Sequence, residues 1–187
     1  LPAGLWRLHG IRPANHPQRR LALGARWAAR TELPRLLQNW CGAQIPISRW
    51  TKTLYEILSV DEDEFWSWHW TFKSTRFKTP QPLLGPTRLT DLAINVVLPW
   101  LWARAEGGDE QIRARVKQRY FEWYPAEDNS VLRHARERLL GTSSPALFTT
   151  ASAQQGLIQI LRDFCDHSNS VCECCKLPEL VCEFGVA

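Results

Sequence analysis

The stretch "TELPRLLQNW", residues 31–40, shows the pattern that decides the fold. Thr31 can cap the start of a helix, and Pro34 stands in the first turn, where its missing N–H costs little. The apolar residues that follow have the spacing i, i+3, i+4 and i+7 of a single helix face. They are Leu33, Leu36, Leu37 and Trp40. The stretch therefore predicts an amphipathic helix that buries this face.

The same periodicity predicts helices along most of the chain. Two of them begin at residues that cap helices well, at Asp128 or Asn129 and at Thr149 or Thr150, and one ends at Gly141. The predicted segments are 48–58, 92–103, 107–123, 128–141 and 151–165, besides 31–40 and a helix that opens near Pro17. We therefore predict a mainly α-helical protein with six or seven helices around one Trp-rich core. Leu36, Trp40, Trp50 and Leu54 should be buried.

One stretch has a different period. "FWSWHWTFK", residues 65–73, alternates aromatic and polar side chains, which is typical of a strand. We expect a short strand near 65–73, with its aromatic side chains on the core. A proline-rich loop follows and could subdivide the chain near residue 80. Otherwise we expect one helical domain over residues 1–164, with a Cys-rich tail, 165–187, packed on it.

Composition narrows the class of protein. Hydrophobic residues make up 44% of the chain and charged residues 22%, which are ordinary values for a globular protein. The net charge of +4 permits contact with nucleic acid without requiring it. The longest apolar stretch, 92–103, is far shorter than the roughly 20 residues that span a membrane. We therefore expect a cytoplasmic protein without a membrane role. Because the chain has no Met, even at position 1, we expect it to be a piece of a longer protein.

Five of the six cysteines lie within residues 164–182. Four of them have the spacing C-x6-C-x2-C-x6-C, and Cys174 is left over. Two thiolates of a C-x2-C pair can reach one ion from a tight turn, and two flanking cysteines complete a tetrahedral set. The predicted ligands are Cys165, Cys172, Cys175 and Cys182. Zinc and a [4Fe–4S] cluster both suit four thiolates, so the metal remains open.

Two other interpretations compete with a metal. Adjacent Cys174 and Cys175 could bond to each other only with strain, and nothing marks the chain as secreted, so disulfides are the weaker interpretation. The second interpretation is that the cysteines are buried thiols that bind nothing, since Cys is often buried. A closed four-thiolate site would be structural: it would hold a tail that has few apolar residues of its own. The spacing resembles the iron–sulfur loop of endonuclease III-like DNA glycosylases. The last gap in this chain is one residue longer than in that loop, and the chain lacks the catalytic residues of that family.

Two polar groups are candidates for binding. In "GIRPANHPQRRL", residues 10–21, Arg12, Arg19 and Arg20 flank a turn that opens a helix. Such a helix start can hold a phosphate or carboxylate, although an ordinary capped helix with solvated arginines has the same sequence. Asp91 and Asn95, one turn apart in an apolar helix, predict a buried polar network that needs a partner such as Arg12 or Arg88.

Several segments carry a family resemblance. They are "RPANHPQRRLALGARW" (12–27), "LGPTRLTDLAINVVLPWLWA" (84–103), "PAEDNSV" (125–131) and "AQQGLIQILRDFC" (153–165), followed by the clustered cysteines. Together they resemble the C-terminal half of the bacterial domain-of-unknown-function family 2851. That family has no established activity, and its upstream half resembles a divergent restriction-endonuclease-type nuclease core. The resemblance implies that this chain is the helical half of a longer protein. The nuclease-like upstream half would then be the partner of this chain. Cys182 fits the family pattern least, and three cysteines with His167 form an alternative zinc set.

Two functional classes remain open. In the first, the chain is a non-catalytic helical module of a nucleic-acid-processing protein, in which the arginines near the N-terminus and the basic faces of helices 107–123 and 128–141 contact phosphates. The aromatic stretch 65–73 could stack bases, although its alternation favours burial in the core. In the alternative, the chain is a structural or protein-interaction domain with no nucleic-acid role.

Overall fold

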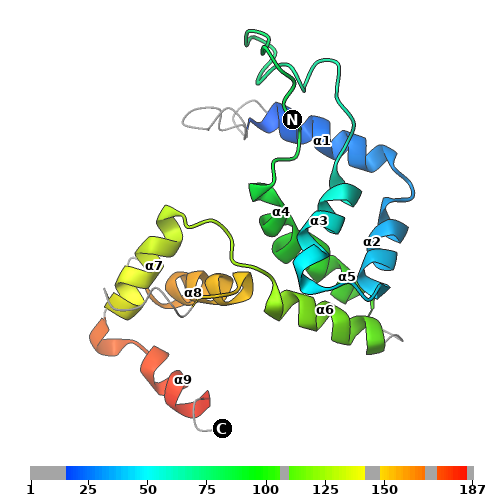
Figure 1. The fold of residues 1–187 in the computed structure, drawn as a ribbon. Helices are drawn as coiled ribbons and strands as arrows, with labels where there is room; N and C mark the ends of the chain where they lie inside the picture. Colours follow the sequence, from blue (N-terminus) through cyan, green and yellow to red (C-terminus); the bar gives the residue numbers. More distant parts are fainter. Residues whose placement is uncertain (1–15, 106–109, 142–147, 167–171, 185–187) are drawn as a thin grey trace. The chain divides into compact units, whose positions relative to one another are not determined.

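The computed structural model describes residues 16–105, 110–141, 148–166 and 172–184, and it is mainly helical (Figure 1). The chain forms two compact units, Leu1–Val116 (unit 1) and Lys117–Ala187 (unit 2). The boundary between the two units falls within the helix over residues 110–122. The Cys-rich tail belongs to unit 2 together with the two helices that precede it.

Unit 1 contains α1 (Pro17–Ala29), α2 (Leu33–Gly42), α3 (Ile47–Leu58), α4 (Thr87–Leu92), the π-helical segment η3 (Ala93–Val97), α5 (Leu98–Arg104) and the first part of α6 (Glu110–Glu122). Unit 2 contains the rest of α6, α7 (Ser130–Leu140), α8 (Ala151–Phe164), the 3-10 turn η5 (Cys172–Cys174) and α9 (Leu177–Phe184). Because α4, η3 and α5 are continuous, the described residues hold eight helices, one more than the upper prediction. The additional helix is α9, which lies in the stretch interpreted as a metal-binding loop. Its Pro178 and Glu179 suit the first turn of a helix.

The core of unit 1 confirms the predicted helix faces. Trp40 of α2 and Trp50 of α3 are buried, Leu54 is completely so, and Leu36 is half-buried. The apolar side of the α4–α5 segment joins them with Ile94, Val97, Leu98 and Leu101. Burying a side chain of this size contributes about 1.5–3 kcal/mol, so these residues hold α2, α3, α4 and α5 together.

The helix over 87–104 changes its hydrogen-bond pattern in the middle. The Leu98 N–H donates to the carbonyl of Ala93, five residues back, and Pro99 follows without an N–H of its own. A π-helical turn accommodates the missing donor without breaking the helix. Among the described residues, no helix is both long enough and apolar enough to cross a membrane.

Unit 2 has a smaller core between α7 and α8. Leu132 and Ala135 of α7 pack with Leu157 and Leu161 of α8. Both helices have the predicted caps: Asn129 accepts from the Leu132 N–H at 2.9 Å, and Thr150 accepts from the Ala153 N–H at 3.3 Å. Gly141 ends α7 with φ 65°, a left-handed conformation that glycine adopts without strain.

The predicted strand near 65–73 is wrong. Residues 61–82 form a series of turns, and the described residues contain no strand. The alternation also fails: Ser67 is 2% exposed, whereas Trp66, Trp68 and Trp70 are only half-buried. Hydroxyl and carboxylate side chains satisfy several backbone N–H groups locally, as Ser74 does for Trp70 and Thr71, and these groups are not available to a strand ladder.

Candidate nucleic-acid interface

The most distinctive surface of unit 1 is its long non-helical connection between α3 and α4, residues 61–82, called the aromatic loop below. Figure 1 shows it extending from the helices at the end of unit 1 where α1 lies. It contains no regular secondary structure, yet two side chains of α1 bond it firmly. These are Arg19 and Arg26.

Arg19 holds both ends of the aromatic loop. Its side chain is only 3% exposed, and its guanidinium donates hydrogen bonds to four backbone carbonyl groups. The acceptors are Trp66 at 2.6 Å, His69 at 3.3 Å, Gln81 at 3.4 Å and Pro82 at 2.8 Å. The guanidinium also lies 4.7 Å from the centre of the Trp70 ring, within the range of a cation–π contact. Burial lowers the pKa of Arg19 from its ordinary value, and nearby Asp63 acts in the opposite direction.

Asp63 organises the start of the aromatic loop. One carboxylate oxygen accepts from the N–H groups of Phe65 at 3.0 Å and Trp66 at 2.7 Å, and the other accepts from Arg26 at 2.7 Å. Its own N–H donates to the Ser67 hydroxyl at 2.9 Å. Burial of Asp63 disfavours the charged form, but these hydrogen bonds outweigh it and hold the pKa of the carboxyl below its ordinary value.

The aromatic side chains of the loop form a partly exposed cluster. Phe65 stacks on His69 at 4.4 Å between ring centres, and Phe72 lies 4.8 Å from Trp66 and 5.6 Å from Phe65. Phe72 is nevertheless 66% exposed. A large apolar side chain at this exposure, held from behind by two other rings, is a common feature of binding surfaces.

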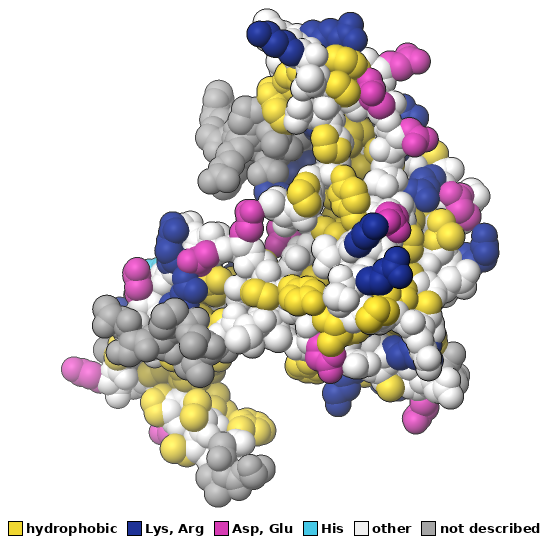
Figure 2. All heavy atoms as spheres, viewed as in Figure 1, with side chains coloured by type: hydrophobic (Ala, Val, Ile, Leu, Met, Phe, Trp, Pro, Cys, Tyr) yellow, Lys and Arg dark blue, Asp and Glu magenta, His cyan; other side chains and the backbone are white. Residues whose placement is uncertain are grey.

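Basic side chains follow the exposed ring along the chain, at residues 73–78, called the tip of the loop below. Lys73, Arg76 and Lys78 are all exposed, and within the described residues none of them forms an ion pair. The Arg76 guanidinium lies 4.2 Å from the centre of the Trp68 ring. Figure 2 shows basic and hydrophobic side chains together at this end of unit 1, with acidic ones to one side. The acidic residues of the loop precede the tip, at 61–64.

Charge is distributed unevenly between the units. Residues 1–116 contain sixteen Lys and Arg against ten Asp and Glu, whereas residues 117–187 contain seven against nine. Unit 1 is therefore basic and unit 2 slightly acidic. A polyanion would be attracted to unit 1.

The three arginines predicted to bind an anion differ in where they lie and in how exposed they are. Arg12 lies outside the described residues, and Arg20 is exposed on α1. Arg19, by contrast, does not present its guanidinium to a solvent anion, because the carbonyl groups of the aromatic loop occupy it. The sequence alone does not show which of Arg19 and Arg20 is buried, because the two are adjacent on α1 and only the structure shows that Arg19 faces the loop.

The basic helix faces are also less open than predicted. Arg119 of α6 is 3% exposed, and Arg113 lies 4.6 Å from the centre of the Trp102 ring. On α7, Arg136 pairs with Asp128. Fewer basic side chains are therefore available here for phosphate contact than the sequence pattern indicated.

The predicted buried network of Asp91 and Asn95 is wrong. The Asp91 side chain is 43% exposed and pairs with Arg88 at 3.0 Å, and Asn95 is exposed and donates to the Asp91 carbonyl. The helix is buried on its other side, through residues such as Ala93, Ile94 and Val97, so the polar pair lies toward solvent.

The four predicted metal ligands lie in separate elements of unit 2. Cys165 ends α8 and packs against the α7–α8 core, Cys172 begins η5, Cys175 follows it, and Cys182 lies exposed on α9. Among the described residues, no three side chains of Cys, His, Asp or Glu are grouped so that they could hold a metal. His167, the alternative ligand, lies outside the described residues. The Arg138 side chain lies 3.7 Å from the Cys172 Sγ atom.

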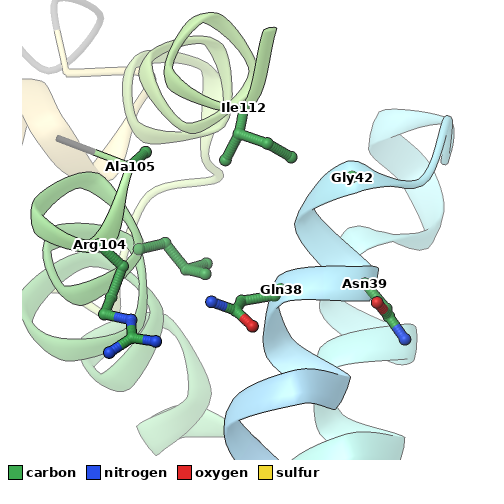
Figure 3. Close-up of a pocket in the computed structure, with 7 residues that line it drawn as sticks. Gln38, Asn39, Gly42, Arg104, Ala105 and Ile112 are labelled. Carbon is green, nitrogen blue, oxygen red and sulfur yellow. The ribbon is translucent and has the colours of Figure 1, made fainter. Parts of the chain in front are cut away.

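Unit 1 also contains a cleft of about 540 Å³. It is lined by Gln38, Asn39, Gly42, Leu101, Arg104, Ala105 and Ile112. Figure 3 shows Gln38 and Ile112 directed into the space between their helices, opposite the helix that carries Arg104. The described residues that line it include no carboxylate, imidazole or thiol, so they offer hydrogen bonds and apolar contact but no acid, base or nucleophile.

Sequence reasoning missed Asp63, Ser67 and Ser74, the residues that shape the aromatic loop. A signal existed: an aspartate two and three residues before the N–H groups it accepts from, and a serine four residues later, is the spacing of side-chain-capped turns. The period-two pattern of the tryptophans obscured it.

The chain matches the sequence model of a known family over residues 1–130, and the family is described as "Protein of unknown function (DUF2851)". No curated protein and no solved structure is significantly similar to the chain. The match covers all of unit 1, including the aromatic loop, and the start of unit 2. The chain thus belongs to the DUF2851 family.

Proposed function

We propose that the chain is a non-catalytic, nucleic-acid-binding module of a nucleic-acid-processing protein, and that the tip of the aromatic loop is its main contact surface. One observation carries the proposal: an exposed ring, Phe72, lies in a loop whose tip carries Lys73, Arg76 and Lys78. Basic side chains attract the phosphate backbone, and exposed rings contact bases. The positive balance of unit 1 supports the same partner.

The acidic residues 61–64 limit where a polyanion can lie. Asp61, Glu62 and Glu64 are exposed, whereas Asp63 is neutralised by Arg26. A nucleic-acid backbone would be repelled from this part of the loop and attracted to residues 73–78. The proposed contact is therefore small, and we expect weak, salt-sensitive binding that a larger protein would reinforce.

The test is binding of the chain to labelled oligonucleotides of about 12 nucleotides, single-stranded and duplex, measured by fluorescence anisotropy at about 50 mM salt. The key variant combines Lys73→Ala, Arg76→Ala and Lys78→Ala. Its matched control removes the same charge from exposed positions of α2 and α3, with Arg35→Ala, Arg49→Ala and Lys52→Ala. We expect the loop variant to lose most of the affinity and the control to lose little. No binding to either oligonucleotide would overturn the proposal and favour a protein-interaction domain.

A specific feature of unit 2 favours that second candidate. Helix α9 contains no buried residue, and its Val181 and Phe184 are 59% and 81% exposed. Apolar side chains at this exposure on a helix can bind a partner protein. Deletion of residues 177–187 removes α9 and leaves the aromatic loop in place. If the aromatic loop binds nucleic acid, this deletion should leave oligonucleotide binding unchanged.

We also propose that Cys165, Cys172, Cys175 and Cys182 bind one structural zinc ion or [4Fe–4S] cluster. The donor chemistry is suitable, although the described residues do not gather these thiols into a site. The support is the tail itself: α9 buries no side chain, so another interaction must offset the cost of ordering it. Metal analysis after aerobic and anaerobic purification tests this proposal. Neither zinc nor iron under either condition, with all thiols titrating as free, would refute it.

A further inference from the structure

We infer that the aromatic loop selects single-stranded over double-stranded nucleic acid, an inference that rests on the proposed function. The relevant feature is Phe72. Its ring packs against Trp66 at 4.8 Å and Phe65 at 5.6 Å, yet 66% of the residue remains exposed. The neighbouring rings fix its position, and the exposed surface can receive one further flat group.

A base in a duplex cannot use that surface. In double-stranded nucleic acid each base is stacked on both neighbours, so its faces are covered and only its edges are accessible. In a single strand the bases can separate, and every base has a face that stacks on an aromatic ring. Stacking on Phe72 is therefore available to single strands and tolerates any sequence.

Arg76, four residues after Phe72 in the loop, offers a second flat group. Its guanidinium lies over the Trp68 ring, 4.2 Å from the ring centre, and the residue remains exposed. Guanidinium planes stack on unpaired bases as aromatic rings do. Lys73 and Lys78, with no ring contact in the described structure, would hold the adjacent phosphates.

The two ends of the loop are also held by hydrogen bonds within the chain itself. Arg19 bonds carbonyl groups at both ends of the loop, and Asp63 caps its first turn. Binding therefore does not carry the cost of ordering these residues, which lets a surface of few side chains bind measurably. The acidic residues 61–64 add to the selectivity, because a rigid duplex would bring its second strand close to exposed carboxylates more readily than a flexible single strand would.

The test compares one sequence as a single strand and as a duplex, with wild-type chain, Phe72→Ala and a matched control. Phe121→Ala suits the control, since Phe121 is 57% exposed and lies in α6 outside the loop. For the wild type we expect at least about tenfold tighter binding to the single strand. Phe72→Ala should lose about tenfold for the single strand and almost nothing for the duplex.

The outcomes separate this inference from the proposed function. Equal, salt-dependent binding of both forms would leave the proposed function intact and overturn the single-strand preference. Equal losses for Phe72→Ala and Phe121→Ala would overturn the stacking role. Because Phe72 is mostly exposed, its substitution should leave the fold intact, which far-ultraviolet circular dichroism verifies.

Discussion

The aromatic loop of unit 1 and the tail of unit 2 solve the same difficulty in opposite ways. Neither has a hydrophobic core of its own. Residues 61–82 have no helix or strand, yet Arg19 and Asp63 tie them to α1 and to themselves. Residues 172–184 are mostly helical, yet none of them is buried. Regular secondary structure is thus a poor measure of how firmly a segment is held.

The difference follows from what each segment can bury. A short isolated helix such as α9, with eight residues, is marginal in water because its nucleation is costly. The loop instead places one buried guanidinium where four carbonyl groups converge. Hydrogen bonds to a charged group are stronger than those between neutral groups. The tail contains no comparable group among its described residues, and its distinctive chemistry is the cysteines.

The largest expected effect concerns the tail. If the cysteines bind zinc, the metal should stabilise residues 165–184 on the order of 10 kcal/mol, because binding energy becomes folding energy where no site is preformed. Limited proteolysis should then cut the tail quickly in the presence of a chelator and slowly with the metal. Cys175→Ser should abolish the protection, whereas Cys174→Ser should keep it. Identical cleavage with and without metal would show that no metal site stabilises the tail.

The second effect concerns the loop. Arg19→Ala leaves four carbonyl groups without their donor and should lower the free energy of unfolding by about 3 kcal/mol. Thermal denaturation followed by tryptophan fluorescence measures the change. Arg20→Ala is the control, since Arg20 is exposed on the same helix, and it should change stability by less than about 0.5 kcal/mol. Equal effects of the two variants would show that the Arg19 network does not hold the loop.

A smaller, pH-dependent effect concerns Asp63. Folding holds the pKa of the Asp63 carboxyl below its ordinary value, so the charged carboxylate stabilises the folded state. This stabilisation is complete above the unfolded pKa of about 3.9, and it is lost as pH falls through the folded pKa. Asp63→Asn should lower stability by about 1 kcal/mol at pH 7, and the difference from wild type should shrink below about pH 4. Stability measured by urea denaturation from pH 3 to 7 provides the comparison. A difference that does not change with pH would mean that the charge of Asp63 is unimportant.

The smallest effect concerns Asp91, which serves as a reference for an exposed pair. Its ion pair with Arg88 is solvent-exposed and three residues apart on one helix, so Asp91→Ala should change stability by about 0.5 kcal/mol or less. Thermal denaturation at low and high salt measures it. A loss of several kcal/mol would restore the buried network that the sequence suggested.

These cases show what could be predicted from sequence. Helix faces were predictable because Trp40, Trp50 and Leu54 recur at helical spacing and have no alternative to burial. The aromatic loop was not, because alternation of aromatic residues indicates a strand only when a neighbouring strand can pair with it. The side chains that replaced that partner, above all Arg19, lie more than forty residues away in sequence. Helix α9 was not predictable in the same way, because the spaced cysteines in and before it also fit a metal-binding loop and its helix signals are limited to the first-turn residues Pro178 and Glu179.

The central claim is that nucleic acid binds through the tip of the aromatic loop. The most direct measurement is the slope of the logarithm of the binding constant against the logarithm of salt concentration for a short single strand. The positive charges of Lys73, Arg76 and Lys78, whether they contact a phosphate directly or lie beside a stacked base, would together neutralise three phosphate charges. They predict a slope of about −2 for the wild type, and the triple alanine variant at these positions should have a slope near zero. The control variant at Arg35, Arg49 and Lys52 should keep the wild-type slope. The same slope for the loop variant as for the wild type would contradict the claim.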